Sequence, residues 1–427
     1  MKLAVVVQRY GADINGGAEL HARYIAEHLS KHAEVEVLTT CAHDYVTWRD
    51  HYQPGVEQIN GVAVRRFQVD HERDVKIFAK CSDRVFGESH SYLDELKWLA
   101  EEGPTSSALI SHLRSRQADY DYVFFFSYRY HHVYHGVRAV PSRAILVPTA
   151  ERDDAIGLAI SPEIFNAVRA VMYNSPEEQR MIQAVSNNHD VPGVVVGVGS
   201  EIPETACADR FRQKFGINGR FALYVGRIDE NKGCKELFSF FLNGLAALPP
   251  GLRLVLIGKE ILPIPEHPRI HHLGFLDDRD KYDALAAADL LLMPSYYESL
   301  SMVALEAWAL GRPVLANGKC EVLRGQCIRS NAGLYYENEA EFIEALRAIA
   351  ESRRLNAAFG DNGRSFFRRH YAWQVIEQKY LDMLARLQQE GSITRQLSPP
   401  GWFARRRKTL RPAAEVLAEL PAGPVLN

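Results

Sequence analysis

The carboxylates Glu298 and Glu306 flank a short apolar segment and are separated by seven residues. Residues 302–310 contain no polar side chain other than Glu306, so a helix over this segment has no solvent-facing stripe. A carboxylate rarely enters an apolar environment without a partner. Its oxygens accept hydrogen bonds, which suits paired hydroxyls such as those of a ribose or a sugar ring. The alternative is a buried ion pair between Glu306 and an arginine such as Arg312 or Arg324.

The start of this helix is predicted to bind an anion. Ser299 can cap the helix through its hydroxyl, which would leave the backbone amides of Leu300, Ser301 and Met302 pointing into a cleft. Amides at a helix N-terminus attract negative charge, because several N–H groups and the helix dipole point at the ligand. We therefore expect phosphate or another anion beside Glu298.

A second candidate anion site is "YVGRIDENKG", residues 224–233. A strand is expected to end at Arg227, and Lys232 stands at the start of the next helix. Two cations beside helix N-terminal amides suit a diphosphate. A solvated turn that carries surface charges is the alternative, and this segment alone favours neither.

The elements that position these residues alternate along the chain. Apolar runs of strand length are followed by segments of helical period, such as 16–32, 278–287 and 300–310. Several runs are apolar throughout, as in parallel strands that are covered on both faces. In open sheets of this kind, ligands bind at the carboxyl ends of the strands. The expected strands are 3–8, 34–40, 61–69, 122–128, 143–149 and 170–175, then 220–227, 252–258, 270–275, 289–295 and 312–318.

This order predicts an α/β protein of two doubly wound, Rossmann-like domains that face each other across a cleft. The Gly- and Pro-rich segment 191–204 is the expected boundary. We divide the chain into a first domain, a second domain, a C-terminal helix that returns to the first domain, and a basic, Pro- and Ala-rich tail. The ranges are 1–196, 197–372, 373–391 and 392–427.

Composition excludes several classes of protein. The chain has 427 residues, 47% of them hydrophobic and 24% charged, as in a soluble globular protein of two or three domains. With a formal net charge of -3, the chain has no excess of positive charge that would bind nucleic acid. The six cysteines form no C-x2-C pair, so no metal site or disulfide scaffold is predicted. The apolar run within the first ten residues is too short for a signal peptide, so we expect a cytoplasmic protein.

Together these motifs resemble the retaining glycosyltransferases of family 4, which have the GT-B fold of two Rossmann-like domains. "GRIDENKG", "MPSYYESLSMVALEAWALGRPVLANG" and "GGAE" at 16–19 carry the resemblance, which extends from residue 2 to about residue 390. It implies that Arg227 and Lys232 grip the leaving diphosphate, that Glu298 contacts the donor sugar, and that Glu306 binds the nucleotide ribose. Further expected donor contacts are Gly16, Gly17, Leu300 and Ser301 at the diphosphate, and Gly258 and Phe275 at the base.

The implied reaction moves a hexose from a nucleoside diphosphate sugar to a hydroxyl of a glycan or lipid-linked acceptor, as in the biosynthesis of cell-envelope polysaccharide. No metal or other cofactor is expected, because cations and helix amides can neutralise the diphosphate. "DYD" at 119–121 lies at the start of a strand, which is the end opposite the cleft, so we interpret it as a solvated turn. His131, His132 and His135 follow a strand and could line an acceptor pocket, although packing is the expected role of at least two of them.

The chain departs from the family pattern at two positions. Ser301 stands where many members have glycine, and Glu151 occupies a position that is often histidine. An ionised carboxylate there would repel the charge that grows on the leaving diphosphate. Pairing with Arg152, or protonation through burial, would remove this repulsion. We expect Glu151 to contact the donor sugar or the acceptor.

Two other functions are compatible with parts of this pattern. A nucleotide-sugar-binding subunit without catalytic activity would keep the fold and the donor site, and the change at Glu151 favours it. A dinucleotide-dependent oxidoreductase would need G-x-G-x-x-G after the first strand, and "RYGADINGGAE" does not fit. The segment 401–412 has five basic and no acidic residues, so a peripheral contact with anionic lipid is weighed against a solvated tail.

Overall fold

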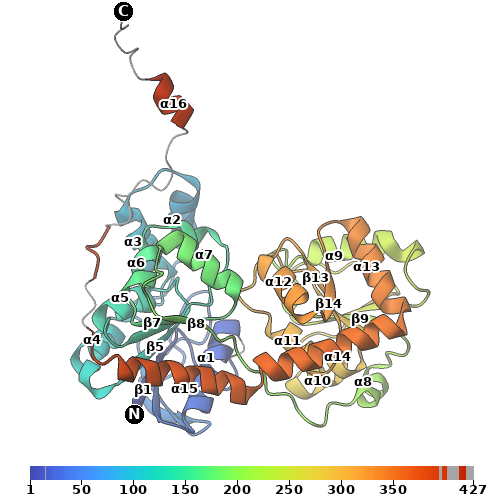
Figure 1. The fold of residues 1–427 in the computed structure, drawn as a ribbon, viewed down its shortest axis with the longest axis horizontal. Helices are drawn as coiled ribbons and strands as arrows, with labels where there is room; N and C mark the ends of the chain where they lie inside the picture. The colour runs from blue at the N-terminus through green and yellow to red at the C-terminus, as the bar shows by residue number, and fades with distance from the viewer. Residues whose placement is uncertain (15, 394–396, 402–412, 420–427) are drawn as a thin grey trace, which may run out of the picture.

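The computed structural model describes residues 1–14, 16–393, 397–401 and 413–419. Two α/β domains stand side by side, each with a central sheet between layers of helices (Figure 1). The fold class predicted from the alternating pattern is therefore confirmed. Apart from Gly401, the basic segment 401–412 lies outside the described residues.

The first sheet has eight strands in the order β3-β4-β2-β1-β5-β6-β7-β8. All neighbours pair in parallel except β3 and β4, which are antiparallel. The central strands are buried on both faces, which explains their continuous apolar runs. The strands are β1 (Lys2–Val6), β2 (Glu34–Thr40), β3 (Gly55–Ile59), β4 (Val62–Phe67), β5 (Tyr122–Phe126), β6 (Ala144–Val147), β7 (Ala170–Tyr173) and β8 (Gly193–Val195).

The second sheet has six strands, all parallel, in the order β11-β10-β9-β12-β13-β14. Its order reverses between β9 and β12, and a ligand crevice is expected at such a switch point. The strands are β9 (Phe221–Val225), β10 (Arg253–Ile257), β11 (Ile270–His272), β12 (Leu290–Met293), β13 (Val314–Asn317) and β14 (Gly333–Tyr336).

Helices cover both sheets. No helix in the described parts of the chain is long and apolar enough to cross a membrane. The helices of the first domain are α1 (Gly17–Leu29), α2 (Val75–Gly87), α3 (Tyr92–Glu102), α4 (Ser107–Arg116), α5 (His131–Ala139), α6 (Ile160–Ala167) and α7 (Pro176–Ser186). Those of the second are α8 (Ala208–Phe215), α9 (Cys234–Asn243), α10 (Asp278–Ala287), α11 (Met302–Ala309), α12 (Glu321–Ser330), α13 (Glu339–Glu351) and α14 (Arg353–His370), and α16 (Ala413–Ala418) lies near the C-terminus.

The helix α15 (Trp373–Gln389) follows α14 but packs against the first domain (Figure 1). The ring of Tyr380 lies 5.7 Å from that of Phe124 on β5, and Lys379 Nζ donates to the carbonyl oxygen of Val196. The chain thus crosses between the domains twice, once after β8 and once before α15. A Cβ added to Gly199 in the first crossing would lie 2.6 Å from the indole of Trp373 in the second, so the two crossings are in contact.

Candidate active site

A cavity of about 660 Å³ opens between the two domains, at the carboxyl ends of their strands. The segments that follow β1, β5 and β6 form one wall, and those that follow β9 and β12 form the other. The predicted residues Arg227, Lys232, Glu298 and Glu151 all line it, together with Gly16, Gly17, Leu300 and Ser301.

The two cations of the second domain are held by the turn between β9 and α9. The Arg227 guanidinium is 54% exposed and lies 3.4 Å from Asp229. Lys232 Nζ lies 2.7 Å from Glu298 Oε1. Burial alone would lower the pKa of Lys232, but the Glu298 carboxylate outweighs burial, so its pKa is raised and the ammonium stays charged. Gly233 completes the turn at a φ of 72°, where a Cβ would lie 2.1 Å from the carbonyl oxygen of Pro294.

Helix α11 begins later than predicted. Ser301, not Ser299, is its N-cap, because the Ser301 hydroxyl accepts from the backbone amide of Ala304 at 3.3 Å. The first amides of the helix are therefore those of Met302 and Val303, and both residues line the cavity. The expected anion-attracting helix end is present, but it is shifted by two residues from the predicted cap.

Glu306 is 2% exposed and has partners that the sequence did not suggest. Its Oε1 accepts from the Tyr282 hydroxyl at 3.0 Å and from Lys281 Nζ at 3.1 Å. The predicted alternative of an ion pair with Arg312 or Arg324 is wrong, because α10 reaches the carboxylate first. Oε2 has no hydrogen-bond partner among the described residues. This oxygen is thus a buried acceptor without a partner, one turn beyond the start of α11, and Glu306 is not among the described residues that line the cavity.

Glu151 follows β6 and faces the second domain. Burial raises its pKa to about 7, and the nearby Glu298 carboxylate adds to the effect. The predicted pairing with Arg152 is wrong, since Arg152 instead lies 3.3 Å from Glu321 on the rim. The buried carboxylate of Glu178 supports the loop by accepting from the backbone amide of Ala150 at 2.6 Å. Near neutral pH, Glu151 is therefore protonated in some molecules, where it can donate a hydrogen bond, and ionised in others, where it can only accept one.

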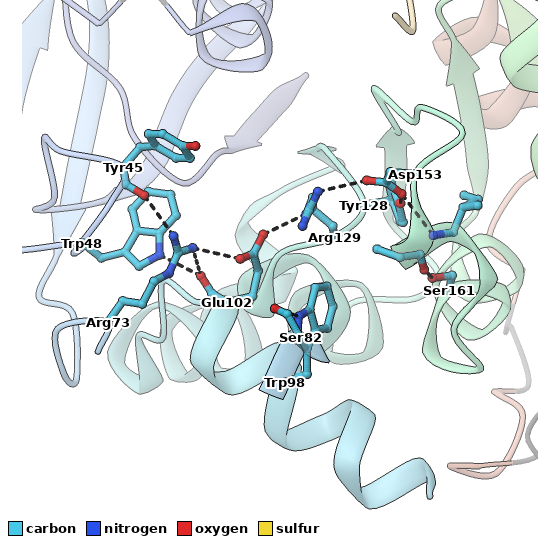
Figure 2. Close-up of polar contacts among 12 residues, drawn as sticks. Tyr45, Trp48, Arg73, Ser82, Trp98, Glu102, Tyr128, Arg129, Asp153 and Ser161 are labelled. Carbon is cyan, nitrogen blue, oxygen red and sulfur yellow. Dashed lines mark hydrogen bonds and ion pairs between the residues drawn. The ribbon is translucent and has the colours of Figure 1, made fainter. Parts of the chain in front are cut away.

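The first-domain wall contains charged residues that we did not predict. Arg9 follows β1 and pairs with Glu19 at 2.5 Å. Arg129 follows β5 and contacts Asp153 at 2.9 Å, and Figure 2 shows it within a row of alternating charges. The signal for these residues is their position, because both arginines come directly after a predicted strand, three residues beyond the observed ends of β1 and β5.

The remaining predicted residues lie elsewhere. Gly258 and Phe275 are not among the described residues that line the cavity. Gly258 approaches Gly226 so closely that a Cβ would lie 1.9 Å from its carbonyl oxygen, and Phe275 is 72% exposed. Asp121 of the "DYD" segment accepts from the backbone amide of Lys2, at the end of β5 away from the cavity. His131, His132 and His135 lie on α5, also outside the described lining.

Comparisons with known proteins bear on the family and the fold. Residues 208–366 match the family model "Glycosyl transferases group 1". The lipopolysaccharide glucosyltransferase WaaG of Escherichia coli K12 is 30% identical over 178 residues, which are 38% of this chain and 45% of the relative. The lipopolysaccharide core biosynthesis glycosyltransferase LpsE of Rhizobium meliloti is 27% identical over 188 residues, 42% and 53% of the two chains. The chain spans about half or less of the length of these relatives.

Solved structures are similar over most of the chain. Sucrose-phosphate synthase from Thermosynechococcus elongatus has a TM-score of 0.66 at 16% identity and covers 91% of this chain and 100% of its own. HepE of Anabaena, solved in complex with UDP-glucose, has a TM-score of 0.65 at 17% identity, with 90% and 100% coverage. The chain therefore has the GT-B fold, and its residues 208–366 match the model of the glycosyl transferases group 1 family.

Proposed function

We propose that this protein is a retaining glycosyltransferase that moves a hexose from a nucleoside diphosphate sugar to a hydroxyl of a glycan or lipid-linked acceptor. The observation that carries the proposal is that anion-attracting groups and carboxyl groups line the same cavity. Arg227, Lys232 and the start of α11 attract a diphosphate, and the carboxyl groups of Glu298 and Glu151 lie beside them from opposite domains. Diphosphate and sugar are the two parts of such a donor.

The donor is expected to lie mainly against the second domain. Its phosphates would contact Arg227 and Lys232, whose charges need no metal ion to balance the leaving group. The free oxygen of Glu306 suits a ribose hydroxyl, which would complete the buried hydrogen bonding. UDP-glucose is the first donor to test, because the HepE structure with a similar fold holds it.

In the proposed reaction, the bond between the sugar C1 and the diphosphate oxygen breaks as the acceptor oxygen attacks from the same face. The acceptor proton passes to an oxygen of the leaving diphosphate. Lys232 stabilises the charge that develops on that oxygen, and Glu298 both holds Lys232 and orients a sugar hydroxyl. In its protonated form, Glu151 can donate a hydrogen bond to the sugar without opposing departure of the diphosphate.

The test begins with thermal shifts of the purified chain in UDP-, GDP-, ADP- and dTDP-sugars, with and without EDTA. A donor present at 100 times its Kd stabilises a protein by about 2.7 kcal/mol. Transfer and donor hydrolysis are then measured with the sugar that binds. If the protein binds none of these donors, the proposal is overturned. Binding without transfer or hydrolysis would instead favour a subunit that binds nucleotide sugars without catalysis.

A further inference from the structure

We propose that the first-domain wall of the cavity accepts an uncharged sugar and rejects acceptors that carry a phosphate or carboxylate beside the reacting hydroxyl. This inference rests on the proposed function, because it assigns the acceptor class of the same cavity. With the diphosphate on the second-domain wall, the acceptor must approach from the first. The charges on that wall therefore decide which acceptors can enter.

Among the described residues, the first domain contributes two cationic side chains to the lining, Arg9 and Arg129. It contributes three carboxyl groups, those of Glu19, Glu151 and Asp153. The wall thus has more acidic than basic groups. A phosphate on the acceptor would need a cation that is not already paired.

The Arg9 guanidinium is already paired at all three of its nitrogen atoms. Its Nε and Nη2 atoms lie 2.9 and 2.5 Å from Glu19 Oε1, and its Nη1 donates to the carbonyl oxygen of His43 at 2.7 Å. Only 14% of the Arg9 side chain and 7% of the Glu19 side chain are exposed. Each nitrogen of this guanidinium therefore has an acceptor, and the pair is largely withdrawn from water.

Arg129 lies between two carboxylates. Its Nη1 is 2.9 Å from Asp153 and its Nε is 2.8 Å from Glu102. Glu102 in turn lies 3.0 Å from Arg73, so positive and negative groups alternate from Asp153 and Arg129 on the wall to two largely buried side chains outside the described lining (Figure 2). Burial works against the charge on Arg129, but the two carboxylates outweigh it and raise its pKa, so the guanidinium remains charged and compensated.

An anionic acceptor would have to break one of these pairs or lie against Glu19 and Asp153 without a counter-ion. Breaking a buried ion pair leaves an uncompensated charge, which is strongly unfavourable. A neutral sugar avoids both costs, because its hydroxyls can donate to carboxylate oxygens that have spare lone pairs. The rings of Tyr45 and Tyr130 also line this wall and offer apolar faces to a sugar ring. The wall therefore selects by unfavourable contacts with charge as well as by favourable contacts with hydroxyls.

The experiment compares two matched acceptors by isothermal titration of the full chain loaded with UDP. One acceptor is a neutral disaccharide, and the other is the same disaccharide with a 6-phosphate. We expect the neutral sugar to bind at least tenfold more tightly. Tighter or equal binding of the phosphorylated sugar would overturn the inference, and so would binding of neither sugar.

Variants of the first-domain wall test which residues cause the preference for the neutral disaccharide. Glu19→Gln removes the charge that compensates Arg9, and we expect the preference for the neutral sugar to fall about tenfold, which is about 1.4 kcal/mol. Asp153→Asn should act in the same direction through Arg129 and serves if the first variant is unstable. Glu27→Gln is the matched control, because Glu27 lies on the same helix as Glu19 but outside the described lining of the cavity. An unchanged preference in both cleft variants would overturn the inference.

Failure of this inference can be distinguished from failure of the proposed function. Donor binding and hydrolysis by the parent protein report on the second-domain wall and require no acceptor. A parent that hydrolyses a nucleotide sugar but binds the phosphorylated disaccharide better retains the proposed function and contradicts only the acceptor class. A parent that binds no nucleotide sugar contradicts the proposed function itself.

Discussion

Replacing Glu151 by glutamine should stabilise the ligand-free protein at alkaline pH. The folded protein holds the pKa of this carboxyl at about 7, against 4.5 for an ordinary glutamate, because the side chain is partly buried and lies near Glu298. Below pH 4.5 the group is protonated in both the folded and unfolded states, so it has no effect on stability. Between pH 4.5 and 7 the unfolded state loses its proton first, so the folded state becomes progressively less stable.

The size of this effect follows from the shift. A difference of about 2.5 pKa units corresponds to about 3 kcal/mol, because each unit corresponds to 1.36 kcal/mol. Glutamine has nearly the same shape and cannot ionise, so it removes this loss. We expect Glu151→Gln and the parent to unfold at similar urea concentrations at pH 4.5. At pH 8 the variant should be more stable by up to about 3 kcal/mol.

Urea unfolding followed by tryptophan fluorescence at half-unit steps from pH 4.5 to 8 measures this difference. Glu321→Gln is the control, because Glu321 lies on the same rim beside Arg152 but is about half exposed. Its unfolding curve should follow that of the parent at every pH. Parallel pH profiles for the parent and Glu151→Gln would refute the reasoning, since they would show that Glu151 ionises normally in the folded protein.

Three further predictions concern the donor. Arg227→Ala and Lys232→Ala should each lower kcat/KM with the preferred nucleotide sugar by about 10²–10³-fold, because each leaves phosphate charge uncompensated. Lys235→Ala, an exposed position on the adjacent helix α9, should have little effect. Steady-state kinetics with near-parent values for both cavity variants would contradict the assignment. Glu306→Gln should mainly raise the donor KM, since ribose contacts are similar before and in the transition state, and an unchanged KM would contradict ribose binding. Glu298→Gln should mainly lower kcat, because it loosens Lys232 and the reacting sugar, and kinetic effects identical to those of Glu306→Gln would refute separate roles.

The sequence predicted those elements that have a strong periodic signal. Continuous apolar runs identified most of the buried parallel strands, and β2, whose sequence is more mixed, was predicted at 34–40 to the residue. The strands β3, β8 and β14 were missed for different reasons. The strand β3 is a largely exposed edge strand of mixed polarity, β8 has three residues within the expected linker, and β14 is a short strand that begins at a glycine.

The candidate site could be predicted only in part, because pairing depends on the tertiary structure. Cations and carboxylates after strand ends indicated Arg227, Lys232 and Glu298, and the fold brings all three to one cavity. No sequence spacing could indicate that Lys281 and not an arginine would reach Glu306, since that contact depends on how α10 packs beside α11. The same limit applies to the cap of α11, where Ser299 and Ser301 are equally suitable as residue types.

The two contacting chain crossings between the domains constrain how the cavity can change its width. Tyr371 packs closely on Gly197, and Trp373 packs closely on Gly199. An ion pair of 2.6 Å between Arg329 and Glu177 also joins α12 to α7. Two adjacent covalent connections resist sliding of one domain past the other, but they permit rotation about a line that passes through both. Such a rotation displaces atoms in proportion to their distance from that line. Because Glu151 and Glu298 belong to opposite domains, such a rotation would change the gap between them, and a ligand that contacts both would favour one orientation of the domains.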